Sequence, residues 1–269
     1  MTGSARTADA ALWIWVVLVL AFLVLPLAVI VPLSFSAGSF LSFPLPGLSW
    51  QWYLEVWHTE VWWRSLENSL KVGVLATLIA TVLGTLAAVG LAQAKFRGRT
   101  LLQAVLISPM IVPLIIVAAG VYFFYARIGL ASSITGLALA HAALGAPFVL
   151  VTVSATLAGF DHNLVRAGQS LGAAPWVVFR RITMPLISPG IVSGALFAFI
   201  TSFDEVVVAL FLTGPAQRTL PRQMFDGIRE NISPAILAVA TVLILLSVAL
   251  LATVEMLRRR NLRIRGIRE

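Results

Sequence analysis

The sequence contains no cysteine and is poor in charged residues, and both shortages narrow what this chain can be. Without cysteine it has no disulfides, no thiolate metal site and no cysteine nucleophile. Charged residues make up 11% of its 269 residues, whereas soluble domains average about 25%. Hydrophobic residues make up 59% and the mean hydropathy is +0.97, more apolar sequence than one soluble core of this length can hide. Most of the chain must therefore face lipid.

The apolar runs are long and continuous instead of alternating with a period of two, so they favour membrane helices over a closed barrel. The sequence predicts an all-α, polytopic membrane protein with about six spans in a single transmembrane domain over residues 1–269. The first run is too long for a signal peptide and no small-residue cleavage site follows it, so it is expected to be retained. The expected spans are residues 11–35, 69–94, 101–125, 134–160, 186–212 and 234–257.

Basic residues are distributed unevenly among the loops and predict the orientation. The second loop, the fourth loop and the C-terminal tail are rich in arginine, whereas the first loop carries three glutamates against one arginine. Positively charged loops stay on the cytoplasmic side. We therefore expect a multi-pass protein of a bacterial inner membrane with both termini cytoplasmic. The net charge of +8 is explained by these anchors, so no nucleic-acid partner is expected.

The sequence also lacks the motifs of an energy-converting or catalytic chain. It has no Gly-x-x-x-x-Gly-Lys-Ser/Thr loop for a nucleotide, and no Ser/His/Asp arrangement. His58, His141 and His162 are scattered without metal-ligand spacing. We expect no catalytic residue, metal or cofactor on this chain, so any energy that it uses must come from a partner ATPase or from an ion gradient.

The fourth loop, residues 161–185, is predicted to form a compact cytoplasmic elbow of two short helices. Leu164, Ala167 and Leu171 share one face at helical spacing. Gly172 suits a left-handed helix end, and Pro175 suits the first turn of a second helix. The residues expected to face the protein body are Trp176, Phe179 and Ile182, and those expected to face outward are Arg180 and Arg181. An elbow of this size fits a groove on a partner protein.

This loop also resembles the signature of the permease subunits of binding-protein-dependent ABC importers. That pattern runs Glu-Ala-Ala, three residues, Gly, and an ending like Ile-x-Leu-Pro. Here Arg166-Ala167-Gly168 stands at the first positions, Leu171-Gly172 at the Leu-Gly pair, and Ile182-Thr183-Met184-Pro185 at the ending, with the spacing kept throughout. Arg166 replaces the Glu and Gly168 replaces the second Ala. The resemblance implies that the ATPase is contacted by Arg166, Ala167, Gly168, Leu171, Gly172, Ala173 and Pro175.

Motifs along the rest of the chain resemble the second permease of spermidine/putrescine-type importers. They include Asn68-Ser69-Leu70, Ser202-Phe203-Asp204-Glu205, residues 211–215, Thr219-Leu220-Pro221 and residues 232–234. The resemblance implies a type I importer permease that works with an ATPase dimer holding ATP and Mg, a homologous second permease and a periplasmic substrate-binding protein. It implies a polyamine or related amine-bearing solute. An ion-gradient-driven transporter or channel subunit is the alternative.

The fifth predicted span contains two adjacent acidic residues, Asp204 and Glu205. A charged Asp at the centre of a membrane helix costs about 2.5–3.5 kcal/mol, so these side chains must face protein, water or a partner. Neighbours on a helix point about 100° apart, so one is expected to line a path while the other pairs elsewhere. Ser202, Phe203, Asp204 and Glu205 are the predicted path residues; a structural ion pair or hydrogen bond is the competing interpretation. Gly190 and Gly194 permit close helix packing, inside the chain or between subunits.

Overall fold

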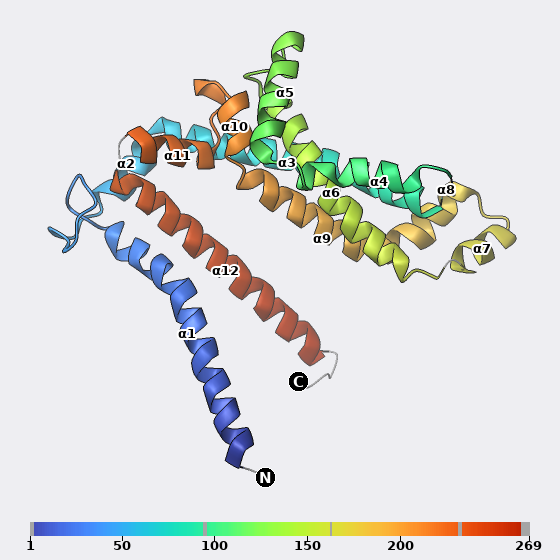
Figure 1. The fold of residues 1–269 in the computed structure, drawn as a ribbon, viewed down its shortest axis with the longest axis horizontal. Coiled ribbons are helices and arrows are strands. Elements are labelled where there is room, and N and C mark those ends of the chain that lie inside the picture. The colour runs from blue at the N-terminus through green and yellow to red at the C-terminus, as the bar shows by residue number, and fades with distance from the viewer. Residues whose placement is uncertain (1–2, 94–95, 162, 231–232, 265–269) are drawn as a thin grey trace. The chain divides into compact units, whose positions relative to one another are not determined.

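The computed structural model describes residues 3–93, 96–161, 163–230 and 233–264, and these residues are mostly helical (Figure 1). Within these ranges the β-structure is limited to an isolated antiparallel bridge between Ser36 and Leu48. The predicted all-α fold class is therefore confirmed. The chain divides into two compact units, residues 1–60 with 226–269 and residues 61–225, and each is described by itself.

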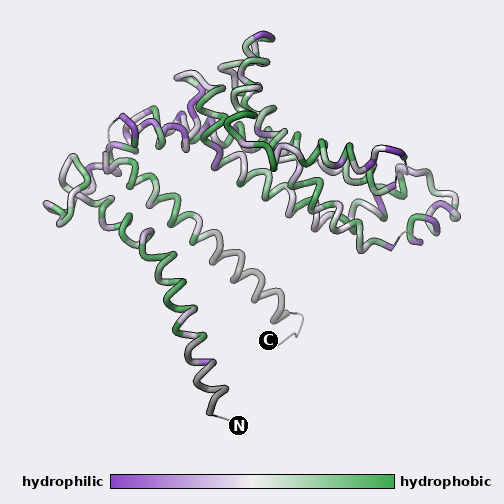
Figure 2. The backbone as a smooth tube through the Cα atoms, viewed as in Figure 1, coloured by the Kyte–Doolittle hydropathy of each residue, from purple (hydrophilic) through white to green (hydrophobic). Residues whose placement is uncertain are grey.

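The first unit contains α1 (Gly3–Leu33), α2 (Gln51–His58) and α12 (Pro234–Ile264). Helix α12 packs against both α1 and α2. The apolar stretch Leu12–Leu33 of α1 has none of its residues buried, as expected of a lipid-facing span, and Figure 2 shows α1 as mainly hydrophobic. An irregular hairpin, residues 34–50, joins α1 to α2.

The second unit is built around the packed pair α6 (Ile134–Ala158) and α9 (Met184–Phe203). Gly190 and Gly194 lie where α9 meets α6, and an added Cβ at either position would collide with Thr152, Thr156 or Val149. The Gly-x-x-x-Gly motif thus serves packing within the chain, the first of the two interpretations it allowed. The remaining elements of the unit are α3 (Glu60–Gln93), α4 (Arg99–Ile107), the 3₁₀ helix η1 (Ser108–Met110), α5 (Leu114–Ile128), α7 (Asn163–Ser170), α8 (Pro175–Val178), the π-helical turn η2 (Phe179–Thr183), α10 (Val207–Leu212), the 3₁₀ helix η3 (Pro215–Gln217) and most of α11 (Leu220–Glu230).

The structure agrees only approximately with the predicted count of about six membrane spans. In the described part of the chain four helices are long and apolar enough to cross a membrane: Leu12–Leu33, Glu60–Gln93, Ile134–Ala158 and Pro175–Phe203. The expected span at 101–125 is instead a pair, Arg99–Met110 and Leu114–Ile128, bent by 97°. Pro109 and Pro113 flank this break, and proline lacks the backbone N–H that a continuous helix needs. The described apolar part of the last helix, Pro234–Ala249, is shorter than a full span.

The second span begins nine residues earlier than predicted, at Glu60, so Asn68 and Ser69 lie inside α3 instead of opening it. Both side chains are buried. The Asn68 amide donates to the carbonyl oxygens of Ala216 and Arg218, each at 3.0 Å, and the Ser69 hydroxyl accepts from the Leu220 backbone N–H at 2.8 Å. The polar pair therefore ties α3 to the segment that precedes α11.

Candidate coupling elbow and translocation site

The first helix of the elbow, α7, ends as the sequence predicts, at Gly172. The residue has a left-handed backbone, φ +79°. The Gly172 N–H donates to the Gln169 carbonyl at 2.9 Å and the Ala173 N–H donates to the Gly168 carbonyl at 3.2 Å. This pair of bonds is the Schellman arrangement, which satisfies carbonyls that the end of a helix leaves free. The turn of the elbow thus depends on a conformation that glycine adopts without strain.

The second part of the elbow is continuous with a membrane helix. Helix α8 begins at Pro175, again as predicted, and passes through η2 directly into α9. One apolar stretch, Pro175–Phe203, therefore runs from the elbow to the acidic pair at its far end. Single π-helical turns inside helices occur frequently at functional sites. The elbow and the acidic pair thus lie at the two ends of one helical stretch.

The side of the elbow that faces the protein differs from the prediction. Trp176 is 67% exposed, so the expectation that it faces the body is wrong; Val178 is buried in its place, and Phe179 and Ile182 are half-buried. The cause is Gly168, which is buried so closely against Val178 and Ile182 that an added Cβ would lie 2.9 Å from the Ile182 side chain. Helix α7 therefore rests on Val178 and Ile182 and leaves Trp176 outside.

The predicted coupling residues mostly lie on the surface of the elbow. Leu171 is 88% exposed and Leu164 is 43% exposed, so the apolar face of α7 points away from the protein. Ala173 is half-buried and Gly168 is buried. The remaining exposed residues of the predicted set are Arg166, Ala167, Gly172 and Pro175, and Arg180 and Arg181 are exposed as expected. His162 lies outside the described residues.

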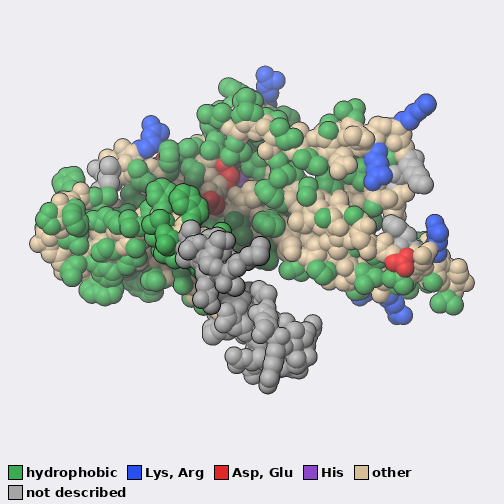
Figure 3. All heavy atoms as spheres, turned by 60° about the horizontal axis from the view of Figure 1, so that its bottom comes forward, with side chains coloured by type: hydrophobic (Ala, Val, Ile, Leu, Met, Phe, Trp, Pro, Cys, Tyr) green, Lys and Arg blue, Asp and Glu red, His purple; other side chains and the backbone are tan. Residues whose placement is uncertain are grey.

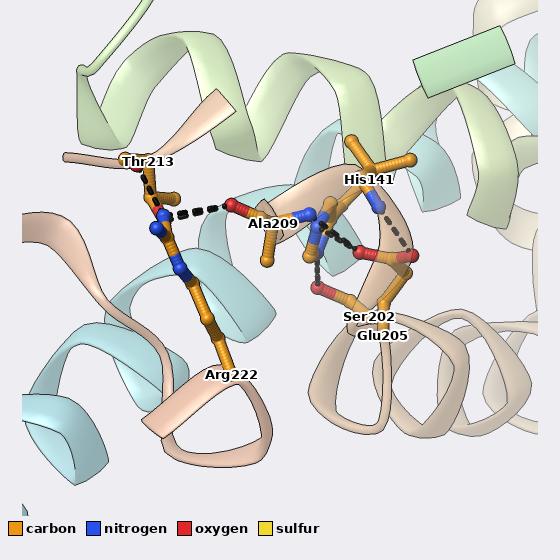
Figure 4. Close-up of polar contacts among 7 residues, drawn as sticks. His141, Ser202, Glu205, Ala209, Thr213 and Arg222 are labelled. Carbon is orange, nitrogen blue, oxygen red and sulfur yellow. Dashed lines mark hydrogen bonds and ion pairs between the residues drawn. The ribbon is translucent and has the colours of Figure 1, made fainter. Parts of the chain in front are cut away.

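The acidic pair does not lie inside a continuous helix, which corrects the predicted span 186–212. Helix α9 ends at Phe203, Asp204 takes the non-helical position after it, and α10 begins at Val207. The Glu205 carboxylate explains the break: its Oε1 accepts from the Val208 N–H at 2.7 Å and its Oε2 from the Ala209 N–H at 3.0 Å (Figure 4). It satisfies two of the donors that the start of α10 leaves free.

Glu205 is also held from α6 by His141. The two side chains are 3% and 0% exposed, and His141 Nε2 lies 3.2 Å from Glu205 Oε2. On the other side of the ring, His141 Nδ1 lies 2.9 Å from the hydroxyl of the buried Ser202 (Figure 4). The sequence interpretation tested His141 only as a metal ligand. An ionisable residue within an apolar span, which is by default a sign of function, would have identified it.

The opposite end of α10 is held by the positively charged side chain of Arg222. Arg222 of α11 donates to the Ala209 carbonyl at 3.1 Å and to both the carbonyl and the hydroxyl of Thr213 (Figure 4). Negative charge at the start of a helix and positive charge at its end both favour the helix dipole. Helix α10 is thus fixed at its two ends by Glu205 and Arg222. The sequence analysis singled out Glu205 as a site residue but not Arg222.

Asp204, in contrast to its neighbour, is exposed. It lines an open hollow formed where the bend between α4 and α5 meets the break between α9 and α10, and Glu205 forms part of the wall. Other lining residues are Met110, Ile111, Pro113, Phe148, Ile200 and Thr201. Figure 3 shows acidic side chains recessed near the middle of this face with hydrophobic side chains around them, and a further acidic side chain at the right-hand edge near basic ones. Of the predicted path residues, Asp204 lies on the hollow, Phe203 is half-buried, and Ser202 and Glu205 are buried.

A helical membrane body with an exposed elbow and a mainly apolar, acid-bearing hollow is typical of a transport permease. Residues 80–263 match the model of the binding-protein-dependent transport system inner membrane component, and the chain belongs to this family. It is 31% identical to the spermidine/putrescine transport system permease protein PotC of Haemophilus influenzae, over 90% of this chain and 94% of that protein. It is 32% identical to the putrescine transport system permease protein PotI of Escherichia coli, over 86% and 85% of the two chains.

The fold is shared with a solved structure of a bacterial ABC transporter involved in the import of the acidic polysaccharide alginate. The TM-score is 0.74 at 14% sequence identity, and the match covers 96% of this chain and 98% of that one. The predicted resemblance and the type I permease architecture are confirmed. Because members of the family are membrane transport subunits, the chain is an inner-membrane permease and not an enzyme.

Proposed function

We propose that this chain forms half of the translocation path of an ATP-driven importer. The partners are a homologous second permease, an ATPase dimer that holds ATP and Mg, and a periplasmic protein that delivers the solute. Family membership and the exposed elbow support this assignment. We place both termini in the cytoplasm, on the side of the basic elbow, following the distribution of arginines.

In the proposed mechanism the elbow transmits the movement of the ATPase to the path. Leu164, Leu171 and Trp176 offer apolar contacts, and Arg166, Arg180 and Arg181 offer charged ones. The continuous stretch Pro175–Phe203 carries the displacement to the break at Asp204. Helix α10 is held at both ends, by Glu205 and Arg222, so we expect it to move as one piece, with backbone angles changing at its junction with α9.

The solute that we propose is a polyamine or a related small amine-bearing compound. The observation that carries this proposal is the exposed carboxylate of Asp204 on a largely apolar hollow, while the neighbouring Glu205 is already occupied by backbone N–H groups and His141. Asp204 is the member of the acidic pair that is open to a passing cation. The relatives named for spermidine and putrescine transport support the same solute class.

Asp204→Asn is expected to reduce the maximum rate of polyamine uptake several-fold with a smaller change in apparent affinity. A carboxylate in a path speeds a cation only if it attracts without holding it tightly, and the periplasmic protein sets the affinity. The measurement is uptake of labelled spermidine or putrescine into proteoliposomes holding the whole transporter. Wild-type rates in this variant, or a delivery protein that binds an anion, would exclude the cationic path.

The proposed assembly predicts that the purified complex contains one copy of this chain, one homologous permease and two ATPase copies. A chain with a docking elbow and no nucleotide-binding loop of its own must obtain its energy from a partner ATPase. Native mass spectrometry of the detergent-extracted complex measures these ratios. Uptake by this chain alone, driven by a proton or sodium gradient, would assign it to the secondary transporters instead.

A further inference from the structure

The hairpin between α1 and α2, residues 34–50, exposes an unusual amount of apolar surface at its tip. Phe40, Phe43 and Leu48 are 77%, 88% and 76% exposed. Phe40 and Phe43 lie towards the turn of the hairpin and Leu48 stands on its paired base. These three residues, called here the apolar tip, lie outside the elbow and outside the hollow lined by Asp204.

The base of the hairpin is well ordered by specific contacts. The Ala37 N–H donates to the Gly47 carbonyl at 3.0 Å, and the Ser49 N–H donates to the Phe35 carbonyl at 2.7 Å. The Trp52 indole donates to the Ser36 carbonyl at 2.7 Å. Three aromatic rings, Phe35, Trp50 and Tyr53, pack together beneath it with centroids 4.9–5.3 Å apart. The apolar tip is therefore carried by a base that specific hydrogen bonds and aromatic contacts hold in place.

The hairpin begins where a membrane-crossing helix ends. The exposed apolar stretch Leu12–Leu33 has 22 residues, which is about 33 Å of helix and matches a hydrocarbon core of about 30 Å. Ser34 follows at once, so the hairpin starts at the membrane boundary. Irregular backbone is not tolerated in the lipid-exposed hydrocarbon core. The backbone of the hairpin must then lie at the depth of the headgroups or farther from the centre of the bilayer.

Charge decides between lipid and a soluble protein as the partner of the apolar tip. No charged residue or histidine occurs from residue 10 to residue 54. Charged groups steer a soluble protein onto its binding surface, and this stretch offers none. Phenylalanine, leucine and tryptophan without charge are the side chains that enter the boundary between headgroups and acyl chains.

We propose that the apolar tip is a membrane anchor: Phe40, Phe43 and Leu48 lie among the lipids of the leaflet at which α1 ends. The hairpin then fixes the depth of the end of α1 and keeps the entrance to α2 at the membrane surface. This inference concerns the first structural unit alone and does not depend on the solute or on the ATPase.

The test uses the natural absence of cysteine, because each single-cysteine variant carries one label without any background. Phe43→Cys and Phe40→Cys are labelled with the environment-sensitive dye NBD in the full chain, reconstituted in phosphatidylcholine vesicles. Ser170→Cys, on an exposed polar position of the elbow, is the matched aqueous control. Spin-labelled lipids with shallow or deep doxyl groups and aqueous iodide are the quenchers.

We expect the labels at residues 43 and 40 to be quenched by shallow doxyl lipid and protected from iodide, at a depth of about 5–10 Å below the headgroup boundary. The label at residue 170 should show the reverse. A further variant places a charge in the apolar tip: Phe43→Asp should increase the quenching by iodide of a label at residue 40. Iodide access at residue 43 would overturn the proposal. So would protection from both quenchers, or protection that arises only when the periplasmic protein is added, since the tip would then contact protein.

Discussion

Gly172→Trp is expected to lower uptake by about tenfold or more while the membrane body still folds. The residue has φ +79°, a conformation that costs a residue with a Cβ about 1–2 kcal/mol, and 1.4 kcal/mol corresponds to a factor of ten. Apart from Gly172 and its two neighbours along the chain, no atom of the described residues lies within 4 Å of the position where a Cβ would stand, so the indole would project outward from the elbow. It would therefore disturb the turn and the surface offered to the ATPase, and not the core.

The readout is solute-stimulated ATP hydrolysis together with uptake in proteoliposomes. Gly172→Asn is the matched rescue, because asparagine tolerates the left-handed conformation and is small. Gly90→Trp controls for bulk, since Gly90 lies in α3 with nothing near its Cβ position. Normal coupling of hydrolysis to uptake in Gly172→Trp would contradict the role of the elbow.

Glu205→Gln is expected to lower the stability of the protein by about 1–3 kcal/mol, because a buried donor loses its acceptor. Both carboxylate oxygens of Glu205 accept backbone N–H groups of α10. An amide has a single acceptor oxygen, so in either orientation its NH₂ group must face one of these two backbone donors. We expect a lower melting temperature in detergent and a loss of uptake that follows from the release of α10.

The neighbouring position is the control for this prediction. Asp204 is exposed and ends α9 through its backbone N–H, which Asp204→Asn leaves in place, so this variant should keep the wild-type melting temperature while it slows uptake. The adjacent carboxylates then separate into a structural group and a path group. Equal melting temperatures for Glu205→Gln and the wild type would show that the capping of α10 contributes little, and a large loss of stability in Asp204→Asn would reverse the two roles.

The two predictions meet on one continuous element. Gly172 precedes the start of Pro175–Phe203 and Glu205 follows its end, so the elbow and the clamp on α10 lie at opposite ends of the same stretch. A variant at one end should alter conformational coupling at the other without a direct contact. The continuous helical stretch between the two sites is the physical reason for this expected coupling.

The elbow shows how far local sequence rules reach. The helix end at Gly172 and the helix start at Pro175 are set by the backbone preferences of glycine and proline, and both were predicted. The orientation of Trp176 was predicted wrongly, because it depends on how closely α7 approaches Val178 and Ile182 through Gly168. That approach is a contact between two elements and leaves no periodicity in either of them.

The acidic pair shows the same division. An apolar stretch interrupted by Asp204 and Glu205 predicted that one would face the path and the other would be paired, but not which one. The choice depends on His141, which lies 64 residues earlier than Glu205 in the chain, and on Arg222 at the far end of α10. The bend between α4 and α5 likewise turned one predicted span into two helices and opened the hollow that Asp204 lines.

The sequence by itself determined the helical membrane class, the family and the position of the elbow, because hydropathy, loop charge and turn-forming residues act over short distances along the chain. Tertiary structure alone decided which carboxylate is buried, where the fifth span breaks and which side chains the elbow exposes. These features depend on hydrogen bonds and close packing between residues far apart in the sequence, since a buried Glu205 is stable only where the N–H groups of α10 and the ring of His141 meet it.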